Sequence, residues 1–426
     1  IKMPFNTISV IGLGYIGLPT AAMFASKEKK VIGVDVNQHT VDTINSGKIH
    51  IVEPQLDLLV KKAVDGGFLK ATTSPEPADA FLIAVPTPFL PADTEGAIPQ
   101  PDLSYIKSAT KAIARVLKKG DLVILESTSP VGTTEIMADW LAGFRPDLTF
   151  PQIQGIESDI RIAHCPERVL PGHVVRELVD NDRVIGGMTK RCSEAAMQLY
   201  QIFLEGECVV TNARTAEMAK LTENASRDVS IAFANELSVI CDKIDVDVWE
   251  LIQLANRHPR VNILQPGPGV GGHCIAVDPW FIVSRTPEQA RLILAARRVN
   301  DAKPAWVIER VKVSIAEFLQ DNPEKKISDV TIACYGLAFK ADIDDLRESP
   351  ALKIAQELTR MHSGTTLSVE PNISDLPANV KGIKLVSYDD AILAANIHVL
   401  LVDHSLFKEN KIVAKFTVDC KGIWKS

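Results

Sequence analysis

The chain has 426 residues, of which 46% are hydrophobic and 23% charged, and its formal net charge is −7 at pH 7. This length predicts two or three domains rather than one. The acidic balance argues against a nucleic-acid-binding protein, and because no apolar run approaches a membrane span of about 20 residues, we expect no membrane insertion. Seven scattered cysteines without a CxxC pair are typical of reduced thiols in a cytoplasmic protein and suggest no metal site.

Short apolar runs alternate with helical stretches through the first half of the chain. The expected strands are Thr7–Ile11, Val31–Asp35, Ala80–Val85, Leu122–Glu126 and Arg161–His164, and the expected helices include Leu103–Leu117 and Thr133–Ala142. Short buried strands that alternate with helices are typical of a doubly wound parallel sheet. We therefore predict an α/β fold.

The first strand runs directly into GLGYIG at residues 12–17, a GxGxxG motif at a strand-to-helix turn. Gly12 permits the tight turn, Gly14 lets the backbone approach a pyrophosphate, and Gly17 lets the helix pack on the strand. Asp35 ends the second strand, where its carboxylate would bind the adenosine ribose and repel a 2′-phosphate. NAD is therefore favoured over NADP, and the alternative is a purely structural turn. The candidate cofactor-binding residues here are Gly12, Gly14, Tyr15, Ile16, Gly17 and Asp35.

Two threonines follow the next strands along the chain. Thr87 lies in VPTP and Thr128 in ESTSPVGT. In such sheets the ligand lies beyond the carboxyl ends of the strands, so these hydroxyls could bind the cofactor or a bridging water. Alternatively they only cap turns and helices.

The middle of the chain contains a long helical segment, residues 212–244, without Gly or Pro. Lys220, Asn224 and Arg227 are spaced i, i+4 and i+7, so they share one face of this helix. They are either solvated or form a pocket for an anion or oxyanion.

A glycine-rich segment, NILQPGPGVGGHC at 262–274, follows this helix. Its glycines and prolines exclude regular secondary structure and leave backbone amides available to a ligand. Cys274 ends the segment, so it is either a thiol activated as a nucleophile or an ordinary buried thiol beside a flexible loop. His258 and Arg260, in RHPR just before it, could bind a diphosphate or sugar, or form a solvated turn.

A second α/β unit without a GxGxxG motif follows a charged linker at 324–329. Its expected elements are strands Val330–Tyr335, Thr366–Val369 and Ile397–Asp403 and a helix at Pro350–Met361. The loop GLAFKADIDDLRESP at 336–350 occupies the strand-end position where ligands bind. Its Lys340 and Arg347 could contact phosphates or simply offset the neighbouring acids.

Six motifs in this order resemble those of the UDP-glucose/GDP-mannose dehydrogenase family, and the resemblance runs from Ile8 to about Gly422. They are GLGYIG with Asp35, STSPVGT at 127–133, CPERVLPG at 165–172, EMAKLTEN at 217–224, GPGVGGHC at 267–274 and GLAFKADIDDLRESP at 336–350. Within the family, PERVLPG and PGVGGHCIAVDPW are most similar to the enzymes that act on UDP-N-acetyl-D-mannosamine for surface polysaccharide.

The resemblance implies two Rossmann-like doubly wound parallel-sheet domains, joined by a long central helix and a helical dimerisation domain. We expect an NAD-binding domain over residues 1–208, a central catalytic and dimerisation domain over 209–318, and a UDP-sugar-binding domain over 319–426. A homodimer formed through the central helix is the expected assembly.

The resemblance also implies a four-electron oxidation of the C6 hydroxymethyl of a UDP-sugar by two NAD molecules in succession. Cys274 would attack the C6 aldehyde, and the second oxidation would give a thioester that water hydrolyses. Lys220 and Asn224 would stabilise the oxyanion, with Lys220 also exchanging protons. Asp278 would help an ordered water to act as a base.

Further roles carry over from the family motifs. Glu167 would activate water for thioester hydrolysis, and Thr128 would position that water or the cofactor. Arg347 would reach toward NAD. Two departures, Pro171 where glucose enzymes often have a second Glu and Val277 where they often have Lys, argue against glucose as the sugar. The candidate substrate-binding residues are Arg168, Val169, Lys220, Asn224, Arg227, His258, Arg260, Gly271, Phe339 and Lys340.

Other functions remain open on the sequence. UDP-N-acetylglucosamine and UDP-glucose are alternative substrates. A two-electron hydroxyacid or 6-phosphogluconate-type dehydrogenase has a similar plan but needs no cysteine. A non-catalytic sensor would bind NAD and a nucleotide sugar without turnover, and the set of Lys220, Asn224, Cys274 and Asp278 argues against it.

Overall fold

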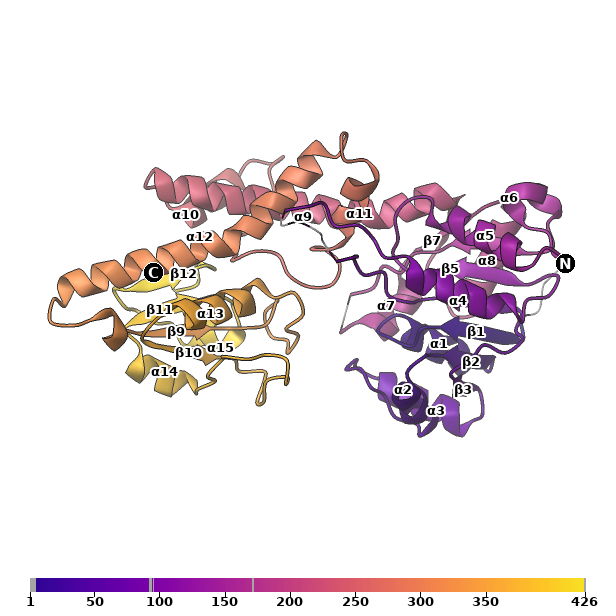
Figure 1. Cartoon of the computed structure of the whole chain (residues 1–426), viewed down its shortest axis with the longest axis horizontal. Helices are drawn as coiled ribbons and strands as arrows, with labels where there is room; N and C mark the ends of the chain where they lie inside the picture. Colours follow the sequence, from indigo (N-terminus) through magenta and orange to yellow (C-terminus); the bar gives the residue numbers. More distant parts are fainter. Residues whose placement is uncertain (1–4, 92–93, 95, 171, 425–426) are drawn as a thin grey trace. The chain divides into compact units, whose positions relative to one another are not determined.

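The computed structural model describes residues 5–91, 94, 96–170 and 172–424. The chain forms two compact units, which we name the N-terminal unit (residues 1–223 and 280–286) and the C-terminal unit (224–279 and 287–426). Figure 1 shows the chain coloured along its sequence. Within the described ranges, no helix is long and apolar enough to cross a membrane.

The N-terminal unit is built on a sheet with the strand order β3-β2-β1-β4-β5-β6-β7-β8. Its strands are β1 (Thr7–Ile11), β2 (Lys30–Val34), β3 (Leu69–Thr72), β4 (Ala80–Ile83), β5 (Leu122–Leu125), β6 (Arg161–His164), β7 (Arg183–Gly187) and β8 (Cys208–Asn212). Its helices are α1 (Gly17–Ser26), α2 (Gln38–Asn45), α3 (Leu56–Asp65), α4 (Ser104–Ala114), α5 (Thr133–Phe144), α6 (Pro151–Gln154), α7 (Val174–Asp180) and α8 (Lys190–Tyr200), with a 3-10 turn at Gly155–Glu157.

Helices cover both faces of this sheet, so its central strands are apolar throughout. Along β5, Leu122 and Ile124 belong to one hydrophobic cluster, and Val123 and Leu125 belong to another. Successive side chains of a strand point to opposite faces, and a strand buried on both faces therefore needs a continuous apolar run. The run LVIL meets this need.

One pairing departs from the expected parallel sheet. β6 and β7 are antiparallel, whereas β7 and β8 are parallel to each other. The segment between β6 and β7 forms a loop and the short helix α7 after the carboxyl end of β6. The chain therefore enters β7 from that edge and runs back beside β6.

The C-terminal unit packs long helices against a second sheet, with the parallel strand order β10-β9-β11-β12. Its strands are β9 (Thr331–Tyr335), β10 (Thr365–Val369), β11 (Ile397–Leu400) and β12 (Thr417–Asp419). Its helices are α10 (Val248–Ala255), α12 (Arg291–Asp321), α13 (Pro350–Met361), α14 (Tyr388–Ala394) and α15 (Ser405–Glu409), with a 3-10 turn at Ile327–Asp329. Two helices, α9 (Ala213–Lys243) and α11 (Asp278–Arg285), have residues in both units.

Helix α12 lies along the second sheet and connects it to the middle of the chain (Figure 1). Val307, Val311 and Ile315 on α12 share a hydrophobic cluster with Ile332 and Val399 of the sheet. This spacing of about one helical turn places the three side chains on one face. The predicted α/β fold, with two Rossmann-like domains and a long central helix, is confirmed.

Candidate functional site

The turn after β1 contains three glycines. At two of them a side chain would collide with the backbone, and at the third the space is open. Gly12 has φ +93°, and a Cβ on it would lie 2.5 Å from the Ala84 carbonyl oxygen. A Cβ on Gly17 would lie 1.7 Å from the Gly12 oxygen. A Cβ on Gly14 would meet no described atom within 4 Å. Open space at Gly14, at the start of α1, is where a pyrophosphate would bind the helix N-terminus.

Asp35 lies directly beside this turn, although it is far from it in sequence. Its Oδ2 accepts a hydrogen bond from the Leu13 N–H (3.1 Å), and its Oδ1 accepts one from the Asn37 N–H (2.9 Å). A dinucleotide with its pyrophosphate at Gly14 would therefore present its ribose to a carboxylate that is already oriented. Tyr15 is 39% exposed and Ile16 is half-buried at the same turn.

The two threonines lie after the strands, as the sequence predicts. Thr87 and Thr128 are both half-buried, in the segments that follow β4 and β5. The Thr87 hydroxyl oxygen is buried and has no hydrogen-bond partner within the described part of the chain. Buried polar atoms normally find a partner, so this hydroxyl fits a ligand that supplies one. Together with the open space at Gly14, it makes the carboxyl edge of this sheet suitable for NAD.

Glu167 sits on a buried network that we name the Arg183 network, formed by Glu126, Glu167, Arg183 and Tyr200. Its Oε1 accepts a hydrogen bond from the Arg168 N–H (2.7 Å), and its Oε2 pairs with the Arg183 guanidinium. Arg183 also pairs with Glu126 at 2.6 Å, and Glu126 accepts a hydrogen bond from the Tyr200 hydroxyl. Both oxygens of Glu167 are therefore anchored before any substrate binds.

The Arg183 network holds two carboxylates for one guanidinium. Burial raises the pKa of Glu126 to about 7, against the lowering effect of Arg183, and the nearby Glu167 raises it further. The sequence motifs did not indicate Glu126 and Arg183. The sequence pattern that could have indicated them is a charged residue at one end of an otherwise apolar run, as in LVILE and DRVIGG.

Three further candidate substrate-binding residues, Arg168, Val169 and Lys220, lie in the N-terminal unit. Arg168 pairs with Glu223 at 2.7 Å. Lys220 is half-buried on α9, three residues before Glu223, and Val169 is half-buried beside Arg168. Pro171 lies outside the described residues.

Cys274 ends the glycine-rich segment at 262–274, which we name the glycine loop, one turn before α11. Its carbonyl oxygen accepts hydrogen bonds from the Asp278 N–H (2.8 Å) and the Val277 N–H (3.1 Å). The Asp278 carboxylate is buried and accepts a hydrogen bond from Asn224 Nδ2 at 2.6 Å. The structure thus brings Asn224 of α9 to the same turn as Cys274 and Asp278.

Exposure distinguishes Cys274 from the other thiols. It is the exposed cysteine among the described residues. Burial raises the pKa of Cys165, Cys334 and Cys420 to about 12, which makes those thiols poor nucleophiles. An accessible thiol at the turn that also holds the part-buried Asn224–Asp278 pair is suited to attack on a carbonyl carbon.

The glycine loop and the 336–350 loop interlock. A Cβ on Gly271 would lie 2.6 Å from the Glu348 carbonyl oxygen and 2.9 Å from Phe339 Cβ, and the Gly272 N–H donates to the Arg347 carbonyl oxygen at 3.2 Å. The Arg347 side chain pairs with Asp345 at 2.6 Å. Gly271 and Phe339 are therefore neighbours.

The other basic candidates of the C-terminal unit are at the surface. Lys340, Arg227, His258 and Arg260 are all exposed. The Arg260 N–H donates to His258 Nδ1 at 3.3 Å, so the RHPR segment forms a local turn. Within the described ranges, no group of three or more His, Cys, Asp or Glu side chains could hold a metal ion.

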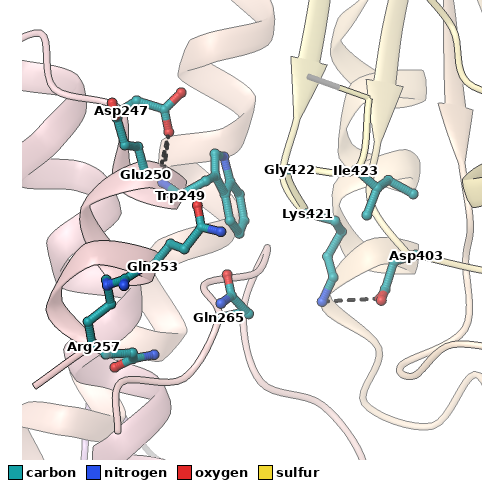
Figure 2. A pocket seen from close by; sticks show the side chains of 11 residues that line it. Asp247, Trp249, Glu250, Gln253, Arg257, Gln265, Asp403, Lys421, Gly422 and Ile423 are labelled. Carbon is teal, nitrogen blue, oxygen red and sulfur yellow. Dashed lines mark hydrogen bonds and ion pairs between the residues drawn. The ribbon is translucent and has the colours of Figure 1, made fainter. Parts of the chain in front are cut away.

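A cavity of about 730 Å³ that no motif indicated opens in the C-terminal unit. Figure 2 shows Trp249 and Gln265 on one side of it, and Lys421 with Asp403 on the other. Lys421 and Asp403 pair at 3.2 Å, and Arg257 adds a second cation. An aromatic face beside cations and amides fits a planar polar base with an anionic group. Its lining residues come from three distant segments, so no local pattern marks it.

Comparisons with known proteins cover the whole of this architecture. Family models match residues 6–204 (UDP-glucose/GDP-mannose dehydrogenase family, NAD binding domain), 214–302 (central domain) and 333–426 (UDP binding domain). A UDP-N-acetyl-D-mannosamine dehydrogenase of Salmonella typhi is 65% identical over 427 residues, 99% of this chain and 100% of the relative. An NDP-N-acetyl-D-galactosaminuronic acid dehydrogenase of Ralstonia nicotianae is 63% identical over 429 residues, 100% of this chain and 98% of the relative.

A solved structure agrees with these likenesses. The UDP-D-ManNAc dehydrogenase of Pyrococcus horikoshii superposes with a TM-score of 0.84 at 38% identity, over 99% of this chain and 96% of that one. The order of the matched domains follows the order of the six sequence motifs. The chain belongs to the UDP-glucose/GDP-mannose dehydrogenase family, and its first part is that family's NAD binding domain.

Proposed function

We propose that this protein is an NAD-dependent dehydrogenase that oxidises the C6 hydroxymethyl of UDP-N-acetyl-D-mannosamine to a carboxylate, using two NAD per sugar. The observation that carries the proposal is the exposed Cys274 at the turn that also holds the Asn224–Asp278 pair. The full-length likeness to the Salmonella typhi enzyme supports the choice of sugar.

Covalent capture at Cys274 explains how one site performs both oxidations. NAD, when bound, accepts a hydride from carbon 6 in each oxidation. The Cys274 sulfur bonds to carbon 6 of the aldehyde, and the aldehyde oxygen becomes the hydroxyl of a thiohemiacetal. Asn224 uses one amide N–H for Asp278, which leaves its second for that oxygen. The Lys220 ammonium, one helical turn earlier on α9, adds positive charge for the oxyanion.

Hydrolysis of the thioester releases the product and regenerates the thiol. A water oxygen bonds to carbon 6 and the carbon–sulfur bond breaks. We assign Glu167 and Thr128 to positioning that water. Each carboxylate oxygen of Glu167 has a protein donor and keeps a second lone pair for a water.

The nucleotide and sugar require a larger set of contacts. We assign the base and ribose to the cavity beside Trp249, Gln265 and Lys421, which neighbours the glycine loop in sequence through Gln265. Stacking on the indole and pairing with cations are the interactions that suit a uridine diphosphate. The interlocked Gly271 and Phe339 then line the path toward Cys274.

We further propose a homodimer formed through α9. Phe233 and Ile240 on α9, and Ile244 directly after its end, are spaced i, i+7 and i+11 and are 55%, 45% and 61% exposed. An exposed apolar stripe on a long helix is suited to burial against another helix. We place the enzyme in the cytoplasm, a reducing compartment, because Cys274 must remain a thiol to react.

A second sugar has specific support. The 63% identity to the Ralstonia nicotianae protein, named for a galactosaminuronic acid, favours an N-acetylated sugar of the galacto configuration as the alternative. Turnover of UDP-N-acetylmannosamine and UDP-N-acetylgalactosamine, compared at equal concentration with UDP-glucose and UDP-N-acetylglucosamine as controls, decides between them.

The test of the mechanism is the number of NADH formed per sugar consumed, for wild type and Cys274→Ala. We expect two NADH per UDP-N-acetylmannosamine, and loss of this turnover in the variant. One NADH per sugar with an unaffected variant would contradict the thioester route and favour a simple alcohol dehydrogenase.

A further inference from the structure

Buried side chains of the two long helices α9 and α12 bind the glycine loop by hydrogen bonds. The Gly267 N–H donates to Asn235 Oδ1 at 2.9 Å, and the Gly267 carbonyl oxygen accepts from Lys303 Nζ at 3.2 Å. Lys303 also donates to Ser238 Oγ at 2.6 Å. Both backbone polar groups of one loop residue are thus bound by side chains. We name Asn235, Ser238 and Lys303 the Gly267 clamp.

The clamp rests on a second layer of polar groups. Asn235 Nδ2 donates to Asn300 Oδ1 at 2.9 Å, and Asn300 Nδ2 donates to Asp228 Oδ1 at 2.8 Å. Asp228 pairs with Arg297 at 2.7 Å. The residues of both layers, Asp228, Asn235, Ser238, Arg297, Asn300 and Lys303, are between 0 and 7% exposed.

Two helix faces supply this network. Asp228, Asn235 and Ser238 lie on α9 at i, i+7 and i+10. Arg297, Asn300 and Lys303 lie on α12 at i, i+3 and i+6. Each set therefore forms one stripe along its helix. Gly267 lies where the two stripes meet, since its N–H binds α9 and its carbonyl oxygen binds α12.

Lys303 is a costly residue in this position. It is 4% exposed, and both of its hydrogen bonds go to neutral oxygens. Burial lowers its pKa to about 8, although its ammonium also lies 4.5 Å from the centre of the Trp306 ring. A well-packed apolar residue would avoid the desolvation cost of a buried charge, so packing alone gives no reason for a lysine.

The contacts continue along the loop toward Cys274. A Cβ on Gly269 would lie 2.9 Å from Pro350 Cβ and 3.4 Å from the Asn300 carbonyl oxygen. Gly271 and Gly272 are fixed by the 336–350 loop. The loop is therefore fastened from Gly267 to Gly272, and Cys274 is exposed just beyond the last fastened residue.

We propose that Asn235 and Lys303 are positioning residues that fix Gly267, and through the glycine loop set the direction in which Cys274 meets carbon 6 of the sugar. The inference rests on the proposed covalent role of Cys274. It adds a requirement that no motif of the chain indicates, namely a donor from α12 and an acceptor from α9 at one glycine.

The first test is Lys303→Met, which keeps the length of the side chain and removes its donors. Lys312→Met is the matched control, because Lys312 lies on the same helix, is exposed and pairs with the nearby Glu309. We expect kcat to fall by about tenfold or more in Lys303→Met, because small displacements of a reacting group are costly, with KM changed by less than about twofold. A wild-type kcat in Lys303→Met would overturn the proposal.

Alkylation of Cys274 separates positioning from a general structural loss. Iodoacetamide modification, followed by mass spectrometry of the Cys274 peptide, should be at least about threefold faster in Lys303→Met than in wild type and Lys312→Met, because a released loop samples more orientations. NAD binding should be unchanged. A lower kcat with an unchanged alkylation rate would overturn the proposal, because the lost activity would then have another origin.

Hydrogen exchange of the wild-type protein provides a test if Lys303→Met fails to fold. The clamp predicts that the Gly267 amide is protected although its segment is irregular, to a degree comparable with the amides of α12. Exchange of Gly267 at the rate of an open loop would overturn the proposal. Alkylation and exchange do not depend on turnover, so they still test whether the clamp holds the glycine loop if Cys274→Ala proves active and the proposed function fails.

Discussion

The Arg183 network of the N-terminal unit and the network around the Gly267 clamp in the C-terminal unit have the same structural role but opposite net charge. Each anchors a loop that carries a candidate site residue, Glu167 in the first case and Cys274 in the second. The first buries two carboxylates around Arg183. The second buries Arg297 against the Asp228 carboxylate, and Lys303 against the neutral oxygens of Ser238 and Gly267.

Burial has the same consequence in both places. It raises the pKa of Glu126 to about 7 and lowers the pKa of Lys303 to about 8. Burial also raises the pKa of Asp228, although Arg297 opposes that shift. In both networks the cost of burying a charge therefore moves ionisable groups toward neutrality. The comparison teaches that a buried polar network beneath a site can be recognised by its shifted pKa values as well as by its contacts.

The largest expected effect comes from removing the one cation that two acids share. Arg183→Met leaves Glu126 and Glu167 buried together, so we expect the free energy of unfolding to fall by about 3–5 kcal/mol. Urea unfolding followed by circular dichroism measures it. Arg297→Met should lose less, since Asn300 still binds Asp228 and the second acid, Asp301, is exposed. Equal losses in the two variants would contradict the expected difference between the two networks.

The second prediction concerns pH and the surplus acid. The pKa of Glu126 is about 7 in the folded state against 4.5 ordinarily, so the folded state binds more protons than the unfolded state between these values. The contribution of Glu126 to the free energy of unfolding therefore falls as pH rises through that window, by on the order of 2–3 kcal/mol. The difference in unfolding free energy between wild type and Glu126→Gln, measured at pH 5 and pH 7.5, should fall by this amount, because groups such as His164 titrate equally in both proteins.

The third prediction is the opposite slope for the surplus base. The pKa of Lys303 is about 8 in the folded state against 10.5 ordinarily, so here the unfolded state binds more protons between these values. The contribution of Lys303 therefore rises with pH from about 8 to 10.5, by an amount similar to that of Glu126. The difference in unfolding free energy between wild type and Lys303→Met, measured at pH 7.5 and 10, checks the sign. A falling difference would contradict it.

Lys303→Met should also show that positioning and stability are separable. Methionine removes a costly buried charge together with two hydrogen bonds, so the two effects offset, and the free energy of unfolding at pH 7 should change by less than about 2 kcal/mol. A larger loss of unfolding free energy in a urea titration would mean that Lys303 contributes mainly to stability rather than to positioning.

The smallest expected effect is that of Ser238→Ala. It removes one acceptor of Lys303 and leaves the bond to Gly267 intact, so we expect a loss of about 1 kcal/mol in the free energy of unfolding. Thermal unfolding beside wild type measures it. A loss as large as that of Arg183→Met would mean that the clamp behaves as a single unit.

Much of the local structure followed from the sequence because its causes are local. The five strands expected in the first half, the long helix at 212–244 and the helix at Pro350–Met361 were predicted to within about two residues, since apolar runs and helix-breaking residues act over a few positions. The glycine turn with Asp35 was predictable for the same reason. The site roles assigned to Lys220, Glu167 and the basic residues stay predictions.

The antiparallel β7, the Arg183 network, the Gly267 clamp and the cavity beside Trp249 were decided only by the tertiary structure. Glu126 and Arg183, or Asn235 and Lys303, are more than 50 residues apart, and each alone looks like an ordinary charged or polar residue of a strand or helix. Their roles arise from which partners packing brings within hydrogen-bond distance and from the loss of water around them. The sequence by itself determined the fold class and the cofactor motif, because turn sterics and hydrophobic periodicity are local. Cys274 became the candidate nucleophile through the resemblance of the sequence motifs to those of the family. The anchoring of the site loops depends on long-range packing, which no short motif contains.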